Sequence, residues 1–202
     1  MGEFIVGIDE VGRGPLAGPV FVGAVAVTRD FDWQSIKGVR DSKKLSPQQR
    51  KDWYLKIDSL RNSGELNFVV RSSPSEMIDA HGIVYSIQSA LDACLLGLGA
   101  EPGTCEIRLD GTLHAPEHFP FQQTIIHGDD IEPIISMASI VAKVERDFLM
   151  GEFAIKYPKY GFESHKGYGT PAHCALIKKH GLCVLHRKSF CTRLEIKVSS
   201  FK

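Results

Sequence analysis

The sequence predicts an α/β protein in which helices flank a mixed β-sheet. Two apolar strand-like runs open the chain, and later runs of this kind alternate with segments of helical periodicity. With 202 residues, 43% of them hydrophobic and 24% charged, the chain has the size and composition of one globular domain. That composition excludes a disordered or fibrous protein.

The first half of the chain contains three predicted strands and two predicted helices. Glycines and prolines between the first two strands, in 12–15 and 18–19, force a tight and irregular loop. Ser46, Pro47 and Gln49 suit the cap, first and third positions of a helix. The predicted strands cover residues 4–9, 19–27 and 66–71, and the predicted helices begin at 46–47 and at 73–74, the second running to 98–99.

The second half contains two shorter strands, a long helix and a short one. A glycine-rich segment, 160–170, separates the two helices. The strands cover 105–110 and 122–127 and the helices 133–155 and 171–180, and the long helix has an apolar stripe formed by Ile134, Ala138, Val141, Val144 and Phe148. No linker divides the chain. We therefore expect a single domain, 1–202, with a core at about 1–157 and a basic helical C-terminal extension at 158–202.

Charge is distributed unevenly along the chain, although the formal net charge is zero. Residues 156–202 contain ten Lys or Arg and two acids, so the rest of the chain carries a net charge of −8. A basic end on an acidic body indicates a polyanionic partner and a cation site. A solvated basic tail without a partner is the alternative.

Nothing in the sequence predicts a membrane protein or a disulfide scaffold. The longest apolar run, residues 19–27, is about half the length of a membrane span, and no signal-peptide pattern precedes it. The five cysteines form no CxxC and no disulfide-like spacing, which fits reduced thiols. We expect a cytoplasmic monomer with no membrane partner.

Carboxylates follow three of the predicted strands. Asp9-Glu10, Asp110 and Asp129-Asp130 lie at or just after strand ends, and such ends meet at one edge of an α/β sheet. Clustered carboxylates raise one another's pKa unless a cation neutralises them, and all-oxygen ligand sets favour Mg²⁺ or Mn²⁺. Two such ions can activate a water for phosphodiester hydrolysis. Acids with a basic flank thus indicate a nuclease, and wet strand ends without a metal are the alternative.

Three other motifs fail on their context. Residues 12–17 match the dinucleotide fingerprint GxGxxA, but a strand and not a helix follows them. There is no GxSxG for a serine nucleophile. Two groups of possible zinc ligands also fail, because a proline interrupts the pair His114 and His118 and the second group lacks zinc-finger spacing. Ordinary surface histidines and core cysteines are the favoured interpretation. The second group, near the C-terminus, consists of Cys174, His180, Cys183 and His186.

The glycine loop and Tyr168 are candidate ligand contacts. Backbone amides of Gly12 and Gly14 can approach a ligand closely, and Arg13 adds a positive charge. Glycines on both sides of Tyr168 predict an accessible ring, and Lys166 stands two residues before it. An aromatic ring beside a cation suits stacking on a sugar or base next to a phosphate. An ordinary loop tyrosine is the alternative.

Five blocks of the sequence together resemble the ribonuclease HII family. In order they are GIDEVGRGPLAGPV at 7–20, DSKKL at 41–45, DG at 110–111, ASIVAKVERD at 138–147 and HKGYGT at 165–170. The related ribonuclease HIII family usually has Lys in place of the loop arginine and an extra N-terminal domain. Arg13 and a first strand that starts at residue 4 point away from it, whereas residues 191–202 match no motif.

The resemblance implies an RNase H-like fold with a site of four carboxylates that bind Mn²⁺ or Mg²⁺ and carry out catalysis. Asp9, Glu10 and Asp110 match the family directly. It also implies substrate contacts: the Gly-Arg-Gly loop grips the 2′-hydroxyl of a ribonucleotide, a tyrosine lies at the RNA–DNA junction, and lysines contact phosphates. These roles fall on Gly12, Arg13, Gly14, Tyr168, Lys43 and Lys166.

The fourth carboxylate requires a choice among Asp129, Asp130 and Asp147. In this family the acid follows a Gly and stands four residues before a Pro, which fits Asp129 and Pro133. Asp147 lies one helical turn after Lys143 and better suits an i,i+4 pair.

The implied activity is that of an endonuclease acting on nucleic acid. It would hydrolyse RNA in RNA–DNA hybrids and cut 5′ of ribonucleotides embedded in duplex DNA, with two metal ions, leaving 5′-phosphate and 3′-hydroxyl ends. A protein that binds hybrids without cleaving them is the alternative, and such a protein would tolerate loss of the carboxylates.

Overall fold

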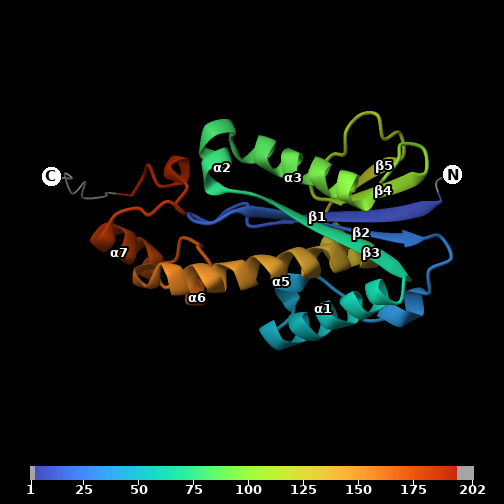
Figure 1. Ribbon diagram of the computed structural model, residues 1–202, viewed down its shortest axis with the longest axis horizontal. Coiled ribbons are helices and arrows are strands. Elements are labelled where there is room, and N and C mark those ends of the chain that lie inside the picture. The colour runs from blue at the N-terminus through green and yellow to red at the C-terminus, as the bar shows by residue number, and fades with distance from the viewer. Residues whose placement is uncertain (1–2, 195–202) are drawn as a thin grey trace.

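A five-stranded sheet runs through the centre of the structure, a computed structural model that describes residues 3–194 (Figure 1). The strand order is β3-β2-β1-β4-β5. β2 is antiparallel to both β1 and β3, whereas β4 runs parallel to β1 and β5 parallel to β4. The predicted mixed sheet is therefore confirmed, with strands β1 Phe4–Val11, β2 Val20–Thr28, β3 Leu66–Ser73, β4 Cys105–Asp110 and β5 Gln122–Ile125.

Helices cover both faces of this sheet. Figure 1 shows α5 (Pro133–Lys156) and α1 (Pro47–Asn62) on one face and α2 (Ser75–His81) and α3 (Ile83–Leu98) on the other. An apolar core lies on each side of the sheet. The remaining helices are α4 Gly128–Ile131, α6 Phe162–His165 and α7 Pro171–His180, with short 3₁₀ turns η1 Trp33–Ile36, η2 Ser42–Lys44, η3 Pro158–Tyr160 and η4 Lys188–Phe190. No helix within residues 3–194 is long and apolar enough to cross a membrane.

Helix α5 lies close to β1 and β2 because glycines face it. A Cβ atom at Gly7 or Gly23 would collide with the α5 backbone. Ile134, Ala138 and Val141 of the predicted stripe are fully buried, but Phe148 is 69% exposed, so the stripe was wrong at that end. Beyond residue 142 the buried side of α5 is instead formed by Arg146 and Met150, which pack against the loop after β1 and against the C-terminal segment.

Most predicted boundaries hold, and two fail at residues with positive φ. The helix start at Ser46 is confirmed as a reciprocal capping box with Gln49. The single helix predicted from 73 to 99 is wrong, because Gly82 adopts φ 85° and separates α2 from α3. Strand β5 ends at Ile125, since His127 takes a left-handed conformation, φ 56°, before α4.

Candidate active site

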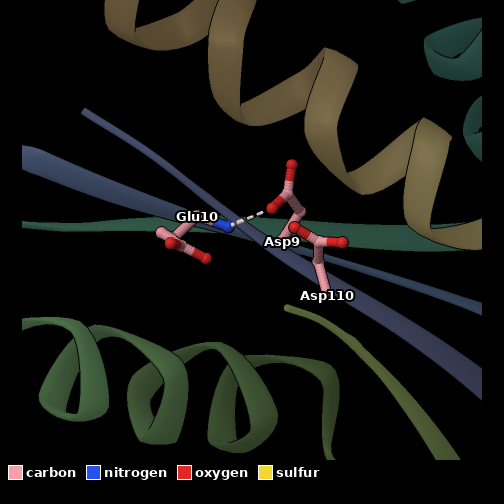
Figure 2. Close-up of side chains that lie close together, drawn as sticks. All are labelled: Asp9, Glu10 and Asp110. Carbon is pink, nitrogen blue, oxygen red and sulfur yellow. Dashed lines mark hydrogen bonds between the residues drawn. The ribbon is translucent and has the colours of Figure 1, made fainter. Parts of the chain in front are cut away.

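Three carboxylates lie close together near the C-terminal ends of the neighbouring strands β1 and β4 (Figure 2). Asp9 and Glu10 lie on β1 and Asp110 ends the parallel neighbour β4, where Ile8 is in register with Leu109. Each side chain offers an oxygen, and these oxygens lie within 4.8 Å of one another. Strand β1 continues past the acids to Val11, so its pairing with β2 fixes the backbone beneath them. The predicted meeting of strand ends is confirmed for these three residues.

Burial and mutual repulsion make this cluster unfavourable without a cation. Asp9 is 1% exposed, its Oδ1 accepts the amide of Glu10 at 2.7 Å, and its Oδ2 has no hydrogen-bond partner within the described chain. Burial raises the pKa of Asp9 well above its usual range, and the charges of Glu10 and Asp110 raise it further. Burial also raises the pKa of Glu10, while Arg13, 3.6 Å away, opposes that rise. An orphaned buried oxygen among three carboxylates fits a hard divalent ion.

Asp129 lies beside the cluster, but its carboxylate belongs to an ion pair. It is 4% exposed on α4, and its amide donates to Asp110 Oδ1 at 3.2 Å. Its carbonyl accepts the Ser136 hydroxyl at 2.8 Å, which ties α4 to α5. Its Oδ2 accepts Nζ of Lys43 at 2.8 Å. The predicted phosphate contact Lys43 is thus paired with the fourth predicted ligand.

The two other candidates for the fourth carboxylate have partners of their own. Asp130 accepts a hydrogen bond of 2.6 Å from Lys44, and its side chain is 36% exposed. Asp147 accepts Lys143 Nζ at 2.7 Å, so the predicted i,i+4 pair is confirmed. Among the described residues, the group of carboxylates with oxygens within 4.8 Å of one another includes neither of them, nor Asp129.

A fully buried arginine holds the loop that follows β1. Arg187 donates to the carbonyls of Gly12 at 2.7 Å, Arg13 at 2.9 Å and Gly18 at 2.9 Å. No ion pair with a carboxylate is formed by Arg187 in residues 3–194. Burial, with a smaller contribution from Arg146, lowers its pKa to about 9.

A second buried arginine, Arg146 of α5, holds the same loop from another side. It donates to the carbonyls of Pro19 at 3.1 Å and Ala17 at 3.4 Å, and its guanidinium lies 5.6 Å from the centre of the Tyr168 ring. A Cβ at Gly12 would collide with this guanidinium. Gly12 is therefore a glycine because of Arg146 and its φ of 92°, and not only because of a ligand.

The carbonyls of this loop face the two buried arginines, and open space remains next to Gly14. A Cβ at Gly14 would meet nothing within 4 Å. The amides of Arg13 and Gly14 take part in no hydrogen bond within residues 3–194. The structure therefore leaves the amides of Arg13 and Gly14 available to a ligand.

Tyr168 is held against the same loop through its neighbour Gly167. The carbonyl of Gly167 accepts the amides of Leu16 at 2.9 Å and Ala17 at 3.3 Å. The Tyr168 side chain is 40% exposed, so the predicted accessibility of its ring is confirmed. Lys166 is half-buried and borders an open groove of about 890 Å³ between α1, α5 and the Tyr168 segment.

His186, a histidine predicted to lie on the surface, is buried instead, next to His173. His173 and His186 are at most 1% exposed, and their Nε2 atoms lie 3.2 Å apart. Nδ1 of His173 donates to the Tyr168 carbonyl, and Nδ1 of His186 accepts the amide of Cys183, so the Nε2 proton belongs to His186. Burial lowers the pKa of both rings to about 4, which keeps them neutral at pH 7. Their role is to support the Tyr168 turn.

The sequence offered one overlooked signal for the arginines. Ala138, Ala142, Arg146 and Met150 recur every four residues on α5, and all four are buried. A charged residue in such a row indicates a buried guanidinium with internal acceptors. No comparable pattern surrounds Arg187, whose partners lie about 170 residues away in the chain.

Comparison with known proteins decides the family. The model of the family described as Ribonuclease HII matches residues 6–194. The chain belongs to the ribonuclease HII family. It is 45% identical over 189 residues to Ribonuclease HII of Chlamydia abortus, covering 93% of this chain and 84% of that protein. It is 40% identical over 192 residues to Ribonuclease HII of a Polaromonas species, covering 95% and 92%.

Solved structures agree with this assignment. Ribonuclease H2 from Pyrococcus horikoshii superposes with a TM-score of 0.74 at 25% identity, covering 92% of this chain and 93% of that one. A ribonuclease HIII crystallised in complex with Mn²⁺ shares the fold, with a TM-score of 0.65 at 18% identity, covering 94% and 65%. As a ribonuclease HII, the protein is a ribonuclease H, an endonuclease that hydrolyses RNA in hybrids, yields 5′-phosphate products and uses divalent metal ions.

The raised pKa of Asp9 predicts that Asp9→Asn stabilises the metal-free protein. Between the unfolded pKa near 3.9 and the raised folded value, the folded state binds more protons, so stability falls as pH rises. At pH 7 with a chelator, we expect the variant to gain about 1–2 kcal/mol, or roughly 2–8 °C in melting temperature. The gain should vanish near pH 3, and Mg²⁺ should stabilise only the wild type.

Asp130→Asn is the control, because Asp130 is paired outside the cluster. A chelated Asp9→Asn protein that melts below the wild type at pH 7 would contradict the argument.

Arg187→Met is expected to loosen the loop from the inside. The substitution leaves the carbonyls of Gly12, Arg13 and Gly18 without their donor. We therefore expect the free energy of unfolding, measured by urea titration, to fall by about 3–5 kcal/mol. Lys188→Met is the matched control, since Lys188 is exposed and makes its bond to Asp79 through the backbone amide. Equal unfolding midpoints for the two variants would contradict a structural role for Arg187.

Proposed function

We propose that this ribonuclease HII also cuts duplex DNA on the 5′ side of a single embedded ribonucleotide, leaving 5′-phosphate and 3′-hydroxyl ends. The observation that carries the proposal is the connection between the Gly12–Gly14 loop and Tyr168. Hydrogen bonds from Leu16 and Ala17 to Gly167, together with Arg146, join these two elements next to the carboxylates. A site that recognises one nucleotide requires such fixed spacing between its contacts.

The carboxylates would hold two divalent ions, Mn²⁺ or Mg²⁺. Asp9, Glu10 and Asp110 would bind the first, and Asp129 would complete the second position. Such ions supply the charge that lowers the pKa of an attacking water and stabilises the leaving oxygen. The protein fixes the ligands in advance, since β1, β4 and α4 hold these side chains before any substrate binds.

Recognition of the ribonucleotide would rest on the loop and the tyrosine. The free amides of Arg13 and Gly14 can donate to the 2′-hydroxyl and its neighbouring phosphate, while the missing Cβ of Gly14 allows close approach. The exposed ring of Tyr168 can stack on the adjacent sugar. Because deoxyribose lacks the 2′-hydroxyl, these contacts would separate RNA from DNA at one position.

The C-terminal segment, 158–202, would contribute to substrate binding within the same domain. Lys166 and Tyr168 border the groove of about 890 Å³, as do Arg50, Lys51 and Lys143, of which Lys143 is paired with Asp147. Cations that border a groove suit a phosphate backbone. Residues 195–202 of this segment lie outside the described part of the chain.

The test is cleavage of a labelled DNA duplex that carries one ribonucleotide, with Mg²⁺ or Mn²⁺ and a chelator control. We expect a metal-dependent nick just 5′ of the ribonucleotide and none in the matching all-DNA duplex. The variant Asp110→Asn should lose this cleavage, because it removes a carboxylate of the cluster. Cleavage of a continuous RNA–DNA hybrid alone would leave the family activity intact and refute the proposal for embedded ribonucleotides.

Tyr168→Ala should affect the single-ribonucleotide duplex more than the continuous hybrid. A single ribonucleotide offers one position at which the ring can align the substrate, so we expect its cleavage to fall by roughly 10–100-fold. Tyr168→Phe should keep most of the activity if stacking is the contribution of the ring. Tyr85→Ala on α3, also an exposed tyrosine, is the control. Equal losses on both substrates would reduce Tyr168 to a structural residue.

A further inference from the structure

Lys43 and Lys44 make two neighbouring ion pairs of different character. Lys43 bonds Asp129 at 2.8 Å, and Lys44 bonds Asp130 at 2.6 Å. The Asp129 side chain is 6% exposed beside the carboxylate cluster, whereas that of Asp130 is 36% exposed. Both lysines come from η2 and both acids from α4, so the chain contains its own matched comparison.

Lys43 is fixed at its backbone, whereas its side chain is largely exposed. Its amide donates to Asp41 Oδ1 at 2.8 Å, and the hydroxyl of Ser42 bonds that of Ser139 on α5 at 2.9 Å, with both serines buried. The Lys43 side chain is nevertheless 69% exposed. Ion pairs with one exposed partner exchange readily, since water can solvate the released ammonium.

We propose that Lys43 is an internal counter-ion of Asp129 and must leave it before Asp129 can bind a metal ion. The inference deepens the proposed function and rests on it. Lys43 neutralises Asp129, which lies outside the three-carboxylate cluster, so the cluster would hold an ion before Asp129 does. For Asp129 to hold a second ion, Lys43 would have to leave it, and the released ammonium would then be free to bind a substrate phosphate.

Metal binding without substrate tests the proposal, because no turnover is involved. Free Mn²⁺ is followed by electron paramagnetic resonance during titration of the wild type, Lys43→Met, Lys44→Met and the double variant Lys43→Met/Asp129→Asn. We expect Lys43→Met to bind a second Mn²⁺ about tenfold more tightly than the wild type, since the competing charge is gone. Lys44→Met should match the wild type, and the double variant should lose the gain.

Each other outcome overturns a stated part of the argument. A second Mn²⁺ bound equally by the wild type and Lys43→Met overturns the counter-ion role. An equal gain in Lys44→Met shows that net charge alone is responsible, and a gain retained in the double variant places the ion away from Asp129. Full Mn²⁺ binding by Asp9→Asn would instead refute the metal site on which the proposed function depends, whatever Lys43 does. Melting curves of all variants confirm folding.

Discussion

The structure depends on the capture of one irregular loop by two buried guanidinium groups. The loop between β1 and β2 places five carbonyls, those of Gly12, Arg13, Ala17, Gly18 and Pro19, against Arg146 and Arg187. Unpaired carbonyls in the interior would cost about 1–3 kcal/mol each, and an unpaired guanidinium would cost more. Neither partner is stable in its place without the other. This mutual requirement joins the C-terminal segment to the sheet edge.

The carboxylate site could be predicted because its geometry follows from local sequence. Apolar runs that end in acids identify strands, and parallel pairing of β1 with β4 brings Asp9 and Asp110 to the same edge. The helix α1 could likewise be placed from its capping residues. In these cases the determining contacts lie within a few residues or follow from general rules of sheet topology.

The rest depends on contacts between distant segments that no periodicity encodes. Arg187 donates hydrogen bonds to carbonyls about 170 residues earlier in the chain. Without this contact, the sequence after residue 156 is equally typical of a solvated basic surface. The buried pair of His173 and His186 was missed for the same reason. At Gly82 the sequence continues a helical pattern, and only the positive φ of 85° shows that the helix breaks there.

Charge at the site shows why its cations and its acids belong together. Arg13 and Lys43, the predicted substrate contacts, each lie next to a carboxylate, Arg13 near Glu10 and Lys43 on Asp129. A cluster of buried acids without partners would push the sheet edge apart or take up protons. Basic side chains next to Glu10 and Asp129 offset part of this negative charge. The same side chains are exposed at their outer side. The change of partner from carboxylate to phosphate that the proposals require would therefore need no rearrangement of the backbone.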